Sequence, residues 1–91
     1  MLNHTINIMS TRIIYSITAG QCRAARALLD ITQPALAEVA GLGLSTIVDF
    51  EKSRRDVSRD AVHEIQKALE GAGVQFVARN DIAGPGVRLR K

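Results

Sequence analysis

Aromatic residues and cysteines are scarce in this sequence. Only 3% of its 91 residues are aromatic and none is tryptophan, which argues against binding of single-stranded nucleic acid on stacked aromatic platforms. Cys22 is the single cysteine, so the chain can form neither an internal disulfide nor a thiolate zinc cluster. His4 and His63 are too far apart in sequence to suggest a metal pair. We therefore expect no bound metal and no cofactor.

Long apolar runs are also missing. Arg12 and several hydroxyl residues interrupt the apolar stretch near the N-terminus, so we expect no membrane-spanning segment and no membrane partner. No basic segment precedes an apolar run as it does in a signal peptide, so a reducing cytoplasm is the expected location.

Positive charge is only mildly in excess, but it is unevenly distributed. Twelve Lys and Arg against nine Asp and Glu give a net charge of +3. The acidic residues lie mostly in the middle of the chain, whereas one loop and the C-terminal end are basic. These basic positions are Arg54 and Arg55 in the loop, then Arg79, Arg88, Arg90 and Lys91. A basic loop fits a polyanionic partner such as DNA, and a solvated surface explains the charge equally well.

Capping residues and apolar spacing predict four short helices between residues 18 and 73. Thr18 and Gln21 form a capping box at the start of the first helix. Thr32 caps the second helix, which has Pro34 in its first turn. The third helix is expected at 44–52, and Ser58 caps the fourth, which Gly71 and Gly73 end. The expected inward residues are Ala25, Leu28 and Leu29, then Leu36, Ala37 and Ala40, then Ile47 and Phe50, then Ala61 or Val62, Ile65, Ala68 and Leu69.

The two ends of the chain have a different character from this middle domain. Residues 1–17 form an extension, with a short strand at 13–17 or no fixed structure. Residues 74–91 form a β-hairpin or a basic tail. In the hairpin, strands at 74–77 and 87–90 flank a Gly-Pro-Gly loop. We expect Phe76 and Leu89 to cover the helices or a second subunit, because two strands alone are marginally stable.

The segment from Gln33 to Phe50 has the spacing of two helices joined by a tight turn. Ala37 supplies the small side chain needed where the helices cross, and Gly41 tolerates the positive φ of the turn. Leu42 fills the gap below the turn, and Ile47 and Phe50 are buried one turn apart. The outward residues are then Leu44, Ser45, Thr46, Val48 and Asp49, as in a helix-turn-helix whose second helix enters the major groove.

The run from Ile31 to Lys52, ITQPALAEVAGLGLSTIVDFEK, resembles the lambda-repressor-like, Cro-type (XRE) helix-turn-helix family. The resemblance covers about residues 20–70 and lies in the combination of Thr-Gln, Leu-Ala, Ala-Gly, Ser-Thr-Ile and Phe-Glu. It implies a mainly α, compact four- to five-helix lambda-repressor-like DNA-binding domain with a short C-terminal β-hairpin.

The resemblance also implies roles for individual residues. Gln33 stands where the family usually contacts a phosphate and sometimes a base. The position of Arg26 and Glu51 implies a buried structural ion pair. The residues that stand at base-reading positions are Leu44, Ser45, Thr46 and Asp49, and those that stand at backbone-contacting positions are Lys52, Ser53, Arg54 and Arg55.

Four positions depart from the family pattern. Gly43 replaces a Ser cap at small cost. Leu44 replaces a polar reader, and it is either a contact for a thymine methyl group or plain apolar surface. Asp49 repels phosphate but can accept a hydrogen bond from cytosine N4. Ser53 replaces a Gly, which predicts a less sharp turn after the third helix.

Two function classes follow, and neither is an enzyme. Cys22 is interpreted as a packing residue and His63 as a surface or boundary residue, and no Ser/His/Asp or Cys/His set falls in one cleft. The first class is a sequence-specific transcriptional regulator, expected to be a repressor, that binds double-stranded DNA as a homodimer. The alternative is an antitoxin or other interaction module that binds a cognate toxin or another protein through its C-terminal extension.

Overall fold

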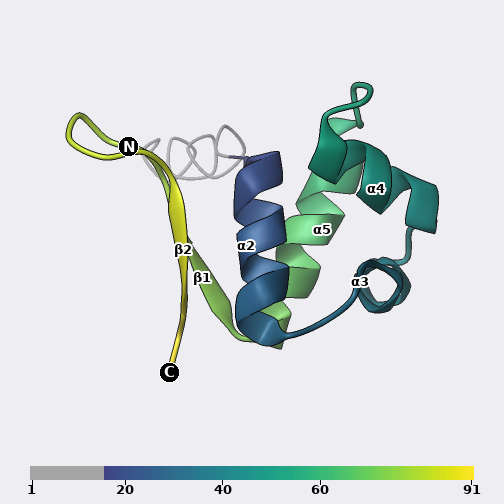
Figure 1. The fold of residues 1–91 in the computed structure, drawn as a ribbon, viewed down its shortest axis with the longest axis horizontal. Helices are drawn as coiled ribbons and strands as arrows, with labels where there is room; N and C mark the ends of the chain where they lie inside the picture. The colour runs from purple at the N-terminus through teal and green to yellow at the C-terminus, as the bar shows by residue number, and fades with distance from the viewer. Residues whose placement is uncertain (1–15) are drawn as a thin grey trace, which may run out of the picture.

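The computed structural model describes residues 16–91, in which four helices precede a two-stranded hairpin (Figure 1). The helices are α2 (Ala19–Leu29), α3 (Gln33–Ala40), α4 (Leu44–Lys52) and α5 (Arg59–Ala72), and the strands are β1 (Val74–Val77) and β2 (Gly86–Leu89). Residues 1–15 of the predicted 1–17 extension, including the first three residues of its predicted strand at 13–17, lie outside the described residues.

Side-chain caps begin three of the helices where the sequence predicts. Thr18 and Gln21 form a reciprocal capping box: the Thr18 amide donates to Gln21 Oε1 at 2.8 Å and the Gln21 amide donates to Thr18 Oγ1 at 3.1 Å. The Thr32 and Ser58 hydroxyls accept from the amides three residues later, at 3.2 and 3.1 Å. These bonds satisfy amides that a helix leaves unpaired at its start.

All four helices end in a residue of positive φ, at Asp30, Gly41, Ser53 and Gly73. Gly41 has φ 73°, as the predicted turn requires. Ser53 has φ 54°, so the expectation of a less sharp turn after α4 is wrong. Its amide donates to Phe50 O at 3.2 Å and the next amide donates to Asp49 O at 3.0 Å, which closes α4 as glycine would.

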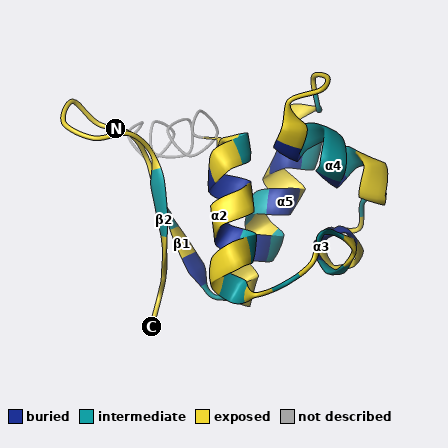
Figure 2. Ribbon diagram, viewed as in Figure 1, coloured by how far each residue is buried: buried dark blue, intermediate teal, exposed yellow. Residues whose placement is uncertain are grey.

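The core lies between the inner faces of the four helices, and the hairpin closes it on the side of α2 and α5 (Figure 2). Its buried residues are Ile17, Cys22, Ala25, Leu36, Ala37, Ile47, Val62, Ile65, Leu69 and Val74. The predicted inward position of Leu28 is wrong, because its side chain is 43% exposed. The buried side of α2 runs through Gln21, Cys22 and Ala25 instead, and only Leu29 extends it toward the helix end.

The hairpin packs its apolar face on the helices. Val74 pairs with Leu89 and Phe76 with Val87 across the antiparallel register. Val74 is buried, and Phe76 and Val87 pack against the core, whereas Leu89 is 44% exposed. The prediction that Leu89 covers the helices is therefore wrong for this chain, and the alternative, that it covers a second subunit, stays a prediction. The Gln21 side chain fastens the hairpin to α2 by donating from Nε2 to Gly86 O at 2.8 Å and to Val77 O at 3.2 Å.

Candidate nucleic-acid interface

Helices α3 and α4 pack against each other across the short turn at 41–43. Leu42 donates its amide to Ala37 O at 3.0 Å and packs partly into the core. Ala37 and Ile47 are buried, as the small-residue crossing and the inward face of α4 require. Gly43 precedes α4 in an extended conformation and provides no side-chain cap, and the Thr46 amide donates to Gly43 O at 3.1 Å instead.

The outer face of α4 carries most of the residues that the resemblance assigns to base reading. Leu44 is 47% exposed and Ser45 is exposed, whereas Thr46 is half-buried. Lys52 is exposed at the other end of the helix. This face combines an apolar side chain, two hydroxyls and a cation at its end. An apolar side chain can contact a thymine methyl group, a hydroxyl can hydrogen-bond to a base edge, and a cation can bind a phosphate.

Glu51, on the inner face of α4, is the centre of a buried polar cluster. Arg26 donates to its carboxylate through Nε at 2.7 Å and Nη2 at 2.8 Å, so the ion pair is bidentate. Gln33 Nε2 donates to Oε1 at 3.0 Å, and Cys22 Sγ donates to Oε2 at 3.1 Å. Arg23 donates to the backbone oxygen of Glu51. One carboxylate thus joins α2, α3 and α4.

The charge state of this cluster follows from its contacts. Burial alone would raise the pKa of Glu51, but the hydrogen bonds from Arg26, Cys22 and Gln33 outweigh it and hold the pKa below its ordinary value. Burial, reinforced by the neighbouring carboxylate, raises the pKa of the Cys22 thiol well above its ordinary range. Glu51 is therefore ionised and Cys22 protonated at neutral pH, and the thiol is a donor rather than a nucleophile.

The predicted phosphate contact of Gln33 competes with its place in this cluster. Its side-chain amide is half-buried and donates to Glu51, although its position at the start of α3 matches the one inferred from the resemblance. No local pattern predicts the contacts of Gln33 and Cys22 with Glu51, because they link residues 18 and 29 positions apart.

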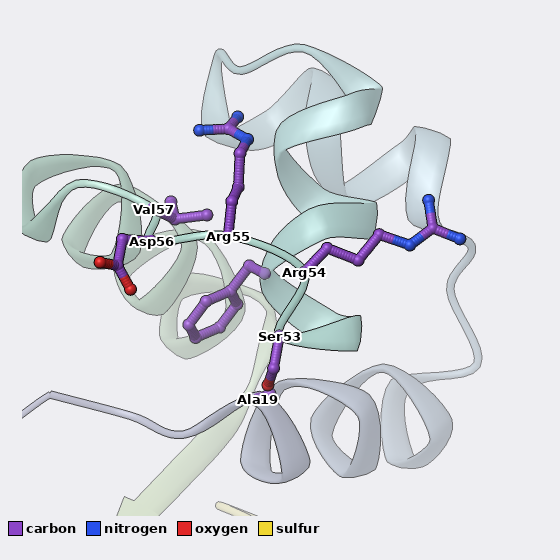
Figure 3. A pocket seen from close by; sticks show the side chains of 7 residues that line it. Ala19, Ser53, Arg54, Arg55, Asp56 and Val57 are labelled. Carbon is purple, nitrogen blue, oxygen red and sulfur yellow. The ribbon is translucent and has the colours of Figure 1, made fainter.

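Asp49 and Arg55 form an ion pair on the surface beside α4. Arg55 Nε donates to Asp49 Oδ2 at 2.8 Å, with 54% of the Arg55 side chain and 21% of the Asp49 side chain exposed. The predicted base reader and the predicted phosphate contact thus neutralise each other. Arg54 is exposed and its guanidinium has no ion-pair partner among residues 16–91. Figure 3 shows the side chains of Arg54 and Arg55 leaving the loop in different directions.

A hollow of about 600 Å³ lies under this loop (Figure 3). It is lined by Ala19, Phe50, Ser53, Arg54, Arg55, Asp56 and Val57. Among the described residues, the lining includes Ser53 and Asp56 but no histidine, so these residues form no nucleophile–base pair of the serine-hydrolase kind. Within residues 16–91 there is also no group of three side chains able to ligate a metal, and no helix is long and apolar enough to cross a bilayer.

A scan against models of protein families and a search of curated proteins both found no match. The interpretation of this surface therefore depends on its own residues and geometry.

Proposed function

We propose that residues 18–73 form a lambda-repressor-like, Cro-type helix-turn-helix domain that binds double-stranded DNA, with α4 in the major groove. The observation that carries the proposal is the division of α4 into two faces. Ile47 and Glu51 tie its inner face to the other helices, while Leu44 and Ser45 remain exposed. Base reading requires a helix whose inner face is fixed by the rest of the domain and whose outer face is exposed to the DNA.

The charges around α4 divide the expected contacts into two kinds. Lys52 and Arg54 are exposed cations at its C-terminal end, where they can reach phosphates. Ser45 and Thr46 lie near its N-terminal end, where they can reach base edges. Phosphate contacts hold the protein on any duplex, whereas base contacts select a sequence.

The first experiment selects bound duplexes from a random pool, which tests binding and defines the operator. A dimer predicts two half-sites about one helical turn, or 34 Å, apart. Affinity is then titrated against salt, on the operator and on a scrambled duplex.

Three variants separate phosphate contacts from base contacts. Arg54→Ala should weaken operator and scrambled DNA alike and lower the salt slope by about one unit. Thr46→Ala should leave the slope unchanged and cost roughly 1–3 kcal/mol on the operator only. Arg88→Ala, on the hairpin away from α4 (Figure 1), is the matched control and should change neither.

The proposal fails if the wild-type protein prefers no duplex at moderate salt. The antitoxin alternative then takes its place, and its test is copurification of an untagged toxin from the native host. Replacing the exposed hairpin residues Leu89 and Arg90, which leaves the core intact, should abolish that copurification if the C-terminal extension holds the toxin.

A further inference from the structure

The outer edge of β1 has strand-pairing groups and no strand beside it in the described part of the protein. The sheet contains β1 and β2 alone. The Arg90 amide donates to Gly73 O at 2.9 Å, and this bond sets the alternation along the hairpin. Gln75 and Val77 therefore direct their N–H and C=O groups to β2, and Val74 and Phe76 direct theirs away from it.

A hollow of about 410 Å³ lies beside β1, at the end of the hairpin next to α5. It is lined by Glu70, Val74, Gln75, Phe76 and Arg90. Successive strand residues point to opposite faces of a sheet. A hollow that touches three consecutive residues of β1 is therefore bordered by both faces or the backbone of that strand, and Glu70 of α5 and Arg90 after β2 complete its lining.

The two edges of the hairpin differ in charge. Strand β1 contains no charged residue, whereas β2 contains Arg88 and is followed by Arg90 and Lys91. Pro85 directly precedes β2. Charged residues and proline on an edge oppose strand pairing, so β1 is the edge open to a partner.

We propose that β1 pairs antiparallel with β1 of a second copy of this chain, which gives a four-stranded sheet across a two-fold axis. Antiparallel pairing places the residues after Val77 of one copy beside the residues before Val74 of the other. Arg79 then approaches Glu70 of the partner subunit, near the negative end of its α5. Two-fold symmetry repeats this opposite-charge contact. An uncharged strand with opposite charges at its two flanks complements a copy of itself.

Sedimentation of the full chain over roughly 5–500 μM tests this pairing without DNA. Wild type should dimerise within this range. Ala78 directly follows β1, and continuing the alternation by one residue directs its N–H away from β2, so Ala78→Pro removes a donor beside the β1 edge. Leu89→Pro, at an exposed residue, removes one from the β2 edge. Ala78→Pro should weaken the dimer at least about 10-fold, and Leu89→Pro should change it by less than about 2-fold.

A charge exchange provides a second test on surface side chains. Glu70→Arg and Arg79→Glu should each weaken the dimer about 10-fold, and the double variant should restore it. A wild type that stays monomeric, a dimer disrupted more by Leu89→Pro than by Ala78→Pro, or a double exchange without recovery would overturn the proposal. Circular dichroism checks that each variant is folded. If Ala78→Pro is not folded, the charge exchange decides.

Discussion

Replacing Glu51 by Gln tests whether one buried carboxylate holds α4 in place. The substitution keeps the size of the side chain and removes its charge. It also puts an NH₂ group against Arg26, Gln33 or Cys22, which all donate to the carboxylate at 2.7–3.1 Å. The Arg26 guanidinium is then left partly buried without its counter-charge, since only 21% of that side chain is exposed.

The expected loss is about 3 kcal/mol in the free energy of unfolding. Removing one partner of a buried pair typically costs about 3–5 kcal/mol, and the remaining solvent contact of Arg26 favours the lower end. For a domain with roughly 5–15 kcal/mol in total this is a large share. The melting temperature should fall by more than about 10 °C.

Urea denaturation measures the effect, with Glu64→Gln as the matched control. Glu64 pairs with Lys67 at 3.7 Å on the surface, with 47% and 57% of the side chains exposed. Its loss should cost less than about 0.5 kcal/mol. If Glu51→Gln changes the free energy of unfolding as little as Glu64→Gln does, the cluster does not stabilise the fold.

Three further predictions follow from the same structure. The native pKa of Glu51 lies below its unfolded value of about 4.3. The stabilisation that the ionised carboxylate provides is therefore complete above that pH and is lost as the pH falls through the native pKa. In urea titrations, the difference in the free energy of unfolding between wild type and Glu51→Gln should become smaller from pH 5 to pH 3. Cys22 is fully buried and protonated, so a thiol reagent at pH 8 should label it only as fast as the protein unfolds; rapid labelling of the folded protein would contradict this burial. Gly41→Ala should lower the free energy of unfolding by about 1 kcal/mol, because Gly41 has a φ of 73°. Gly71→Ala should raise it by about 0.5–1 kcal/mol, because Gly71 lies inside α5 with open space around it. Equal shifts in melting temperature would show that backbone conformation does not decide the effect at these two positions.

Helix boundaries were predictable from sequence because their signals are local. Thr18, Thr32 and Ser58 cap helices within three residues of themselves, and Gly41 marks a turn by its own backbone freedom. The hairpin was predictable from alternation around a Gly-Pro-Gly loop, with β2 beginning one residue earlier than expected.

The remaining differences depend on tertiary arrangement. Spacing places both Leu28 and Leu29 near the face of Ala25, and only the position of neighbouring helices decides that Leu28 is exposed. The alternation of apolar and basic residues assigns Leu89 to the apolar face of β2. It does not show how far along β2 the helices cover that face. At the interface, family resemblance indicated Arg26 with Glu51, while the Asp49–Arg55 pair depends on how the loop after α4 turns back.

The bonds from Gln21 to the hairpin have a consequence for the order of folding. They join residues 56 and 65 positions apart and so close a loop over most of the described chain. During synthesis, α2 can form as soon as its own residues have emerged, but its Gln21 amide finds these acceptors only after Gly86 has left the ribosome. Contacts of such long sequence separation form late because the loop entropy must be lost first. Docking of the hairpin should therefore complete the domain only after both of its strands have been made.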